Sequence, residues 1–317
     1  MSIIKVYSLI STIIGLISRV SDFVRQYSQA IPLINPEAGW VILSPAETRI
    51  RQKIEEAGVP LKEWDVNIYR GVLTGYNDAF IIDGVTKDEL IRQDPKSAEI
   101  IRPILRGKDI KPYIAEYADK WLINAHNGLR ATKLERVNVP LDYPIVFEYL
   151  DQEKFKPLLQ NREDKGSHWT NLRNCAYFQD FEKPKIIYPE ITKFLPFVYD
   201  EKKYFLNNKT FFMVGSHLKY LASLFNSTLF KAIFKGYFPD LGEDRRELRK
   251  VFFEQVKIII PAFIIEETLG AIVDEISVRK GMAASTAKLE AEIDHIIYKL
   301  YNLNEEEIEF VKSAGLI

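Results

Sequence analysis

The sequence has little of the side-chain chemistry that cross-links small proteins or holds metal ions. It contains one cysteine, Cys175, and four histidines among its 317 residues. A single cysteine excludes an intramolecular disulfide and fits a reducing, cytoplasmic compartment. The scattered histidines leave no group of ligands at the spacing of a zinc site. We therefore expect neither a disulfide scaffold nor a structural metal.

The chain also lacks an excess of charge of either sign. Its 43 lysines and arginines nearly balance 44 aspartates and glutamates, so the formal net charge is -1. A protein that coats nucleic acid by charge alone needs a strong positive excess, and the balance excludes that class. The charge balance is still compatible with a folded domain that has one basic face and an acidic face opposite it. With 47% hydrophobic and 12% aromatic residues, the composition is that of a globular protein.

An uninterrupted apolar run long enough to cross a membrane is missing as well. The segment Ile3–Val20 comes nearest, but it is shorter than the roughly 20 residues of a span and is interrupted by serine and threonine. Its isoleucines recur at helical spacing, which predicts an amphipathic helix or linker remnant over residues 1–31 that packed on something upstream. A membrane contact and a secretory signal are the alternatives. We expect no membrane partner.

What the sequence does contain, between Ile68 and Tyr113, is a glycine-punctuated stretch followed by a compact basic segment. Strand-forming residues on both sides of the turn cluster Thr74–Asp78 predict a β-hairpin. The basic segment places four cations within ten residues. A glycine-punctuated hairpin beside a basic segment can bind the phosphate backbone of a nucleic acid. The alternative is an ordinary hairpin followed by a solvated loop. The candidate backbone-contacting residues are Thr74, Asn77, Arg102, Arg106, Lys108 and Lys111.

These motifs resemble the TaqI-like C-terminal specificity domain of type IIG restriction–modification enzymes and adenine-specific DNA methyltransferases. In that family a Gly-x-x-Thr-Gly-x-Asn-x-Ala-Phe-x-Ile stretch precedes an Arg-Gly-x-Asp-Ile loop, and here the two begin at Gly71 and Arg106. Three more stretches follow in the family's order: KPKIIYPEI from Lys183, LASLFNSTLFKAIFK from Leu221, and EIDHIIYKLYNLNEEEIEFV from Glu292. Five motifs in order are more specific than any one of them.

The resemblance implies an α/β (α+β) fold, with a mixed twisted sheet, packed helices and a C-terminal helical region. It also implies a DNA target-recognition domain over residues 32–262 and a helical spacer or contact region over residues 263–317. In relatives a methyltransferase domain precedes this one, binds S-adenosylmethionine and methylates adenine. The expected partners are therefore double-stranded DNA and a methyltransferase domain or subunit.

The sequence lacks the motifs of catalysis. An adenine methyltransferase needs an (Asp/Asn)-Pro-Pro-aromatic loop and a glycine-containing cofactor turn, and neither occurs. A phosphate-binding loop and a nucleophile elbow are also missing. The closest approach to a nuclease motif is Pro239-Asp240 with Arg249, where lysine would be required. We expect that the chain binds without catalysing and holds no cofactor or metal. A protein-interaction scaffold without DNA binding is the alternative.

Two long polar segments carry side chains suited to reading base edges. They run from Asn124 to Val137 and from Asn161 to Asn174. Arginine, asparagine, lysine and histidine donate to bases in the major groove, and a pair of disordered surface loops is the alternative. The second segment is the better candidate because it adds a tryptophan. Its candidate base-reading residues are Arg162, Lys165, His168, Trp169, Asn171 and Arg173.

Local patterns predict most of the other elements. Ser44 and Glu47 have the spacing of a capping box, and Gly58 can end the helix that they start. Asn304 and Glu307 repeat that spacing before a short terminal helix. Short apolar runs predict strands at 120–123, 145–147, 184–190, 209–214 and 258–261, and helical spacing predicts buried helices over 217–230 and 264–300.

Overall fold

The computed structural model describes residues 44–315, so the helix or linker predicted over residues 1–31 and the predicted start of the recognition domain at residue 32 lie outside the described residues. The chain divides into two units, residues 1–48 and 49–317. Helix α2 (Pro45–Ala57) begins as predicted, because the Glu47 amide donates to Ser44 Oγ at 3.1 Å. Within the described residues, no helix is long and apolar enough to cross a membrane.

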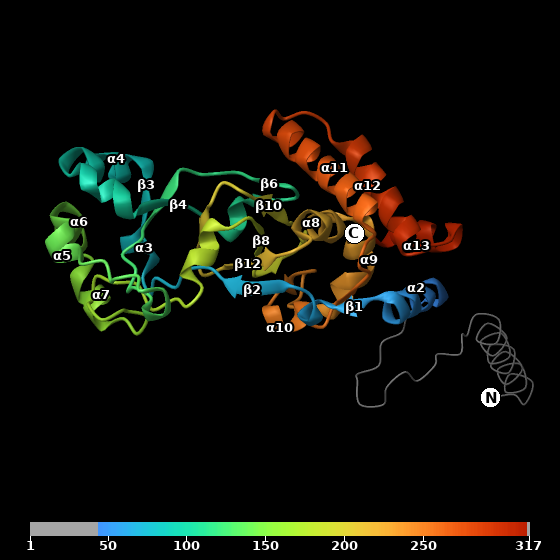
Figure 1. The fold of residues 1–317 in the computed structure, drawn as a ribbon, viewed down its shortest axis with the longest axis horizontal. Coiled ribbons are helices and arrows are strands. Elements are labelled where there is room, and N and C mark those ends of the chain that lie inside the picture. Colours follow the sequence, from blue (N-terminus) through green and yellow to red (C-terminus); the bar gives the residue numbers. More distant parts are fainter. Residues whose placement is uncertain (1–43, 316–317) are drawn as a thin grey trace, which may run out of the picture. The chain divides into compact units, whose positions relative to one another are not determined.

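Two four-stranded sheets organise the second unit (Figure 1). The first has the order β10-β8-β12-β2 and is antiparallel throughout. The second has the order β11-β4-β7-β3 and is mixed, because β11 runs parallel to β4. The predicted α/β class, with mixed strands and packed helices, is confirmed. The strands are β2 (Val66–Arg70), β8 (Lys185–Pro189), β10 (Val198–Asp200), β12 (Thr210–Gly215), β3 (Ile81–Asp83), β4 (Ile101–Leu105), β7 (Lys120–Ile123) and β11 (Phe205–Leu206).

The antiparallel sheet separates two hydrophobic cores. On its central strands, Ile186 and Met213 belong to the first core, whereas their neighbours Ile187 and Phe212 belong to the second. Successive side chains of a strand point to opposite faces, so a strand between two cores is apolar at consecutive positions. This explains why KIIYP and TFFMVG show no alternation between apolar and polar residues.

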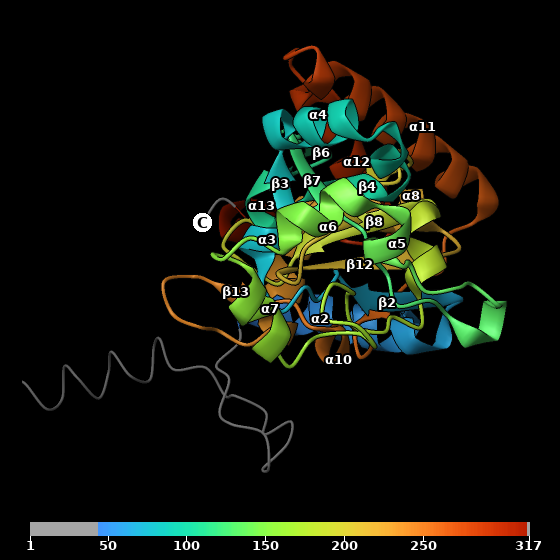
Figure 2. The ribbon, with the colours of Figure 1, turned by 90° about the vertical axis from the view of Figure 1, so that its left-hand side faces the viewer.

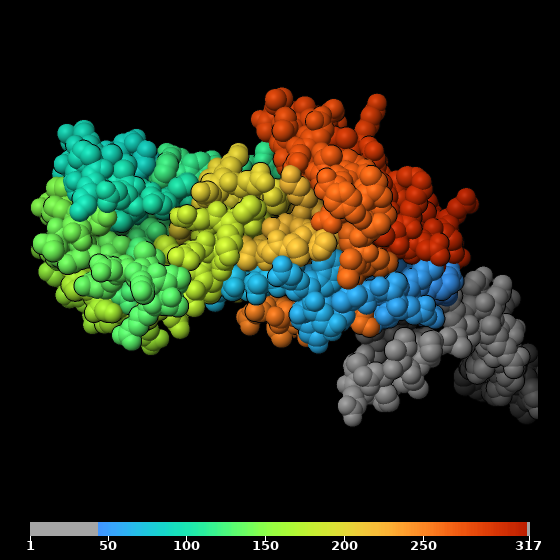
Figure 3. All heavy atoms as spheres, in the orientation of Figure 1, coloured from blue at the N-terminus to red at the C-terminus, as the bar shows by residue number. Residues whose placement is uncertain are grey.

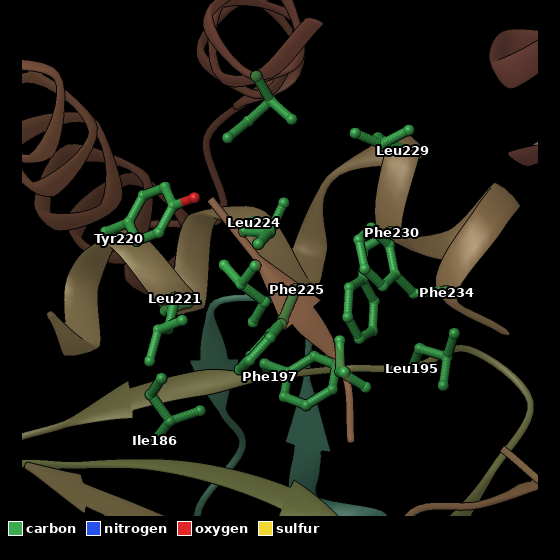
Figure 4. Packing of buried hydrophobic residues seen from close by; sticks show 14 of the residues in the cluster. Ile186, Leu195, Phe197, Tyr220, Leu221, Leu224, Phe225, Leu229, Phe230 and Phe234 are labelled. Atoms are coloured by element: carbon green, nitrogen blue, oxygen red, sulfur yellow. The ribbon is translucent and has the colours of Figure 1, made fainter. Parts of the chain in front are cut away.

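The first core is closed by the C-terminal helices. Figure 4 shows Phe197, Phe225 and Phe230 packed together, and the ring of Phe225 lies 4.9 Å from each of the other two. The predicted burial of segments 217–230 and 264–300 is confirmed, with a break between α11 and α12. The helices are α8 (Leu218–Asn226), α9 (Thr228–Ile233), α10 (Lys250–Phe253), α11 (Phe263–Gly281), α12 (Ala287–Leu300) and α13 (Glu305–Gly315).

The second core lies beneath a group of short helices. Figures 1 and 2 show α4 to α7 gathered at the end of this unit that carries β3, and the space-filling view shows the same teal and green segments apart from the orange and red C-terminal helices (Figure 3). The predicted strand at 145–147 is wrong, because these residues form part of a helix. Pro144 starts that helix at its first position, where a fixed φ is favourable. The helices are α3 (Asn77–Phe80), α4 (Gly84–Gln93), α5 (Val139–Asp142), α6 (Pro144–Leu150) and α7 (Lys156–Asn161).

The predicted β-hairpin is also wrong. Strand β2 pairs with β12 in the antiparallel sheet, whereas β3 pairs with β7 in the mixed sheet. Between them the turn cluster leads into α3, and Thr74 Oγ1 donates to Asn77 Oδ1 at 2.7 Å. Gly71 is required for a close approach, since a Cβ atom there would lie 2.0 Å from the Asn207 carbonyl oxygen. The connection therefore crosses from one sheet to the other.

Three two-stranded pairs complete the strands of the described residues. The predicted last strand at 258–261 is shorter than expected and joins the first strand of the unit rather than a sheet. The pairs are β1 (Val59–Pro60) with β14 (Lys257–Ile258), β5 (Ile110–Lys111) with β6 (Ile114–Ala115), and β9 (Ile191–Thr192) with β13 (Arg246–Glu247).

Candidate nucleic-acid interface

A hollow of about 1200 Å³ opens where β4, β8 and β11 end. Of the residues that the structure describes, seven cationic side chains border it, against the two acidic side chains Glu190 and Asp244. We call this hollow the basic groove. Three of its cations belong to the predicted basic segment, and four were not predicted. The seven are Arg106, Lys108, Lys111, Lys193, Lys209, Lys231 and Lys235.

The predicted basic segment is braced by its own arginine. Arg106 Nε and Nη2 donate to the two carboxylate oxygens of Asp109 at 2.9 and 2.8 Å, and the Arg106 amide donates to the same carboxylate at 2.8 Å. The hydrogen bond to Asp109 raises the pKa of Arg106 above its ordinary value. These contacts fold Gly107–Asp109 into one turn of 3₁₀ helix and leave Lys108 exposed to the groove. Lys108 is therefore better placed than Arg106 to meet a phosphate.

A buried carboxylate lies on the wall of the groove. Glu190 is almost fully buried, and its carboxylate lies 3.4 Å from Arg70, 3.5 Å from Lys209 and 4.0 Å from Arg249. The single negative charge of Glu190 therefore lies within ion-pair distance of three positively charged side chains. The Lys209 side chain is 65% exposed, so Glu190 fixes its direction without removing it from solvent.

The other predicted backbone contacts lie outside the basic groove. Arg102 is on β4, where its Nη1 donates to the carbonyl oxygens of Ala98 and Ile101. Thr74 is buried and bonded to Asn77, as described above. Their role in DNA contact stays a prediction, and none of the three borders the groove.

The two long polar segments form one hydrogen-bonded structure, which we call the joined loops (residues 124–137 and 161–174). Asn171 is fully buried, and its Nδ2 donates to the carbonyl oxygens of Ala125 at 3.2 Å and Val137 at 2.8 Å. The Ser167 amide donates to Asn127 Oδ1 at 2.8 Å. Each loop therefore supplies backbone partners to the other, which is inconsistent with two independent disordered loops.

Arg162 holds the joined loops to the start of α3. Arg162 is 7% exposed, and its guanidinium donates to the carbonyl oxygens of Thr74, Trp169 and Asn171. It also lies over the ring of Phe80 at 4.4 Å. Burial lowers the pKa of Arg162 to about 10, so the side chain stays charged at neutral pH. The base-reading role of Arg162 and Asn171 stays a prediction; both side chains are buried and donate to backbone carbonyl oxygens inside the protein.

The other predicted base-reading residues lie nearer the surface. Lys165 and Arg173 are exposed, and Arg173 pairs with Asp164 at 2.8 Å. His168 and Trp169 are half-buried neighbours with ring centroids 5.5 Å apart. Burial, helped by the charge of Arg136, lowers the pKa of His168 and favours its neutral form. Sequence reasoning did not single out the exposed cations of the first loop, which are Arg130, Lys133 and Arg136.

Comparison with known proteins finds a matching domain family and a curated relative. The model of the TaqI-like C-terminal specificity domain matches residues 102–257. A curated relative, the type II methyltransferase M.BstVI of Geobacillus stearothermophilus, is 20% identical over 283 residues, which are 87% of this chain and 46% of the relative. The chain therefore spans less than half the length of that relative.

Two solved structures are similar in fold. The type IIG restriction endonuclease BpuSI aligns with a TM-score of 0.50 and 15% identity over 86% of this chain and 32% of its own. The type IIL restriction-modification enzyme MmeI, solved in complex with DNA, aligns with a TM-score of 0.50 and 13% identity over 81% of this chain and 35% of its own. The resemblance seen in the sequence is confirmed: residues 102–257 match the TaqI-like C-terminal specificity domain.

Proposed function

We propose that this chain is the sequence-specific DNA-binding module of a type IIG restriction–modification enzyme or an adenine-specific DNA methyltransferase. The observation that carries the proposal is the basic groove, which gathers seven cations against two acids on a chain whose net charge is -1. Charge concentrated in this way suits the phosphate backbone of a duplex. A scaffold for proteins would not need it.

Two groups of residues would share the work. Lys108, Lys111, Lys193 and Lys209 in the basic groove would contact phosphates and set the position of the protein on the duplex, which carries no sequence information. The exposed donors of the joined loops would then reach base edges in the major groove. The internal hydrogen bonds of Arg162 and Asn171 support this division, because they hold the loops in one shape before DNA arrives. The proposed base-reading residues are Arg130, Lys133, Arg136, Lys165 and Arg173.

The chemical step would belong to a methyltransferase domain or subunit. The sequence lacks the cofactor turn and the catalytic loop of such an enzyme, and the curated methyltransferase relative is more than twice as long as its aligned part. S-adenosylmethionine would therefore be bound by that partner, which would methylate adenine at the site selected by this chain. The proposal places both in the cytoplasm, where a lone cysteine stays reduced.

Selection from a pool of random duplexes tests the proposal. The purified full chain is expected to enrich one sequence, because a specific site binds more tightly than random DNA by a factor of about 10³ or more. An R130A/K133A variant should bind DNA and lose the enriched sequence, whereas K108A should keep the sequence at reduced yield. Failure of the wild-type chain to retain any duplex at low salt would contradict DNA binding and favour the scaffold.

A further inference from the structure

A solvent-exposed phenylalanine, Phe194, lies at the border of the basic groove. Phe194 is 75% exposed and follows Lys193, another exposed residue of the same border. Ile191, which is 45% exposed, borders the same groove. Exposed apolar side chains that gather at one place on a surface mark contact sites. A ligand that fits both the cations of the basic groove and the Phe194 ring would carry negative charge and a flat apolar surface.

The segment that presents Phe194 is held at both ends. On one side β9 pairs with β13, and the Phe194 amide donates to Thr192 Oγ1 at 3.1 Å. On the other side the Phe197 amide donates to Asn226 Oδ1 at 3.1 Å. The backbone that carries Phe194 is therefore held in place on both sides.

Leu195 is the residue that separates the exposed ring from the core. It has a φ of 44°, in the left-handed region that a leucine rarely adopts, and it is buried. Figure 4 shows its side chain among the apolar residues of the first core. This conformation lets Leu195 turn inward while Phe194 stays outside. Unfavourable backbone geometry of this kind is often found where a side chain must be presented to a ligand.

We propose that Phe194 is an apolar wedge that stacks on a base of the bound duplex, at a base step facing the basic groove. The inference rests on the proposed DNA-binding function and adds a contact to it. A duplex offers phosphates to the lysines and base faces to the ring within one site. An apolar protein partner would instead bury the same lysines without counter-charges, which is costly.

The test compares two duplexes of one sequence, one intact and one with a single abasic site, by fluorescence anisotropy with the full chain. An intact duplex must be unstacked before a ring can enter, and an abasic site removes that cost. Wild-type protein should therefore prefer the abasic duplex. F194A should lose that preference and bind the abasic duplex about 5- to 150-fold more weakly, the range expected for one base–aromatic stack. F194W should keep both properties.

Phe263 provides the matched control, since it is 77% exposed and does not border the groove. F263A should bind both duplexes as the wild type does. If F194A binds both duplexes like the wild type while K108A weakens both, the wedge is excluded and the DNA-binding proposal stands. If wild-type protein binds neither duplex, both fail. Unaltered thermal melting of F194A and F194W would show that any loss arises at the surface.

Discussion

Arg162 and Asn171 have the side chains of base-reading residues, yet both are used inside the protein. We expect R162A to lower the free energy of unfolding by about 3 kcal/mol, because three carbonyl oxygens lose a charged donor and a buried space opens. Urea unfolding measures the loss. The matched control is R173A in the same loop, whose exposed ion pair with Asp164 should contribute less than about 1 kcal/mol. Equal losses in the two variants would contradict the bracing role of Arg162.

Residue types could be predicted from the sequence here, but burial could not. Both loops were expected, and their donors were identified correctly by type. The partners that bury two of these donors are remote, because Arg162 bonds to Thr74 across 88 positions and Asn171 to Ala125 across 46. An arginine or asparagine suits a base edge and a backbone carbonyl equally well. Only the tertiary fold decides between them.

At the scale of elements, the crossing from β2 to the mixed sheet depends on Gly71. A Cβ atom there would lie 2.0 Å from the Asn207 oxygen and 2.7 Å from the Leu206 oxygen, both backbone atoms that cannot rotate away. We therefore expect G71A to destabilise the protein by about 2 kcal/mol or more. G281A is the control, since nothing lies within 4 Å of its new methyl group, and it should be neutral or stabilising by up to about 1 kcal/mol. Comparable unfolding curves for the two variants would be inconsistent with the close approach.

Helix α13 is held by a buried carboxylate that should make stability depend on pH. Burial alone would raise the pKa of Glu307, but hydrogen bonds from Lys53 and from the Asn304 amide outweigh it, so the pKa lies below its ordinary value of 4.5. A carboxylate with a lowered pKa stabilises the fold above its unfolded-state pKa and loses that contribution as pH falls through the folded-state value. The free energy of unfolding should therefore fall as the solution is acidified below about pH 4.5.

The variant E307Q tests this contribution. It should cost about 1–3 kcal/mol at neutral pH and should flatten the acid limb of the stability curve. Its neighbour Glu306 pairs with Arg49 at the surface, so E306Q should change stability by less than about 1 kcal/mol. An acid limb that is unchanged in E307Q would assign the pH dependence to other carboxylates.

Elements defined by local signals were predictable, and those defined by remote pairing were not. The caps at Ser44 and at Asn304 depend on contacts three residues away, and both are confirmed. The hairpin prediction is wrong because β2 pairs with β12 and β3 pairs with β7, and both partners lie far along the chain. The strand prediction at 145–147 is wrong because three consecutive apolar residues fit a buried helix as well as a strand.

At the scale of the whole molecule, the basic groove is assembled from segments that lie far apart in sequence. Its border combines residues 106–112, 189–196 and 207–209 with lysines of α9 and the turn that follows it. The sequence showed the first of these segments and gave no signal that the others would join it. The near-neutral net charge of the chain does not reveal the excess of positive charge at the basic groove, because acidic residues elsewhere in the chain balance it.

The measurement that tests the DNA-binding claim most directly is the salt dependence of duplex affinity for the full chain, followed by fluorescence anisotropy. The variant is K108A/K193A, which removes two exposed lysines of the basic groove, and the control is K288A, an exposed lysine of α12 outside it. Each phosphate contact contributes about 0.9 to the slope of log affinity against log salt concentration. The account predicts a steep slope for wild type and K288A and a slope smaller by about two units for K108A/K193A. Binding that ignores salt, or a slope that the double variant leaves unchanged, would contradict it.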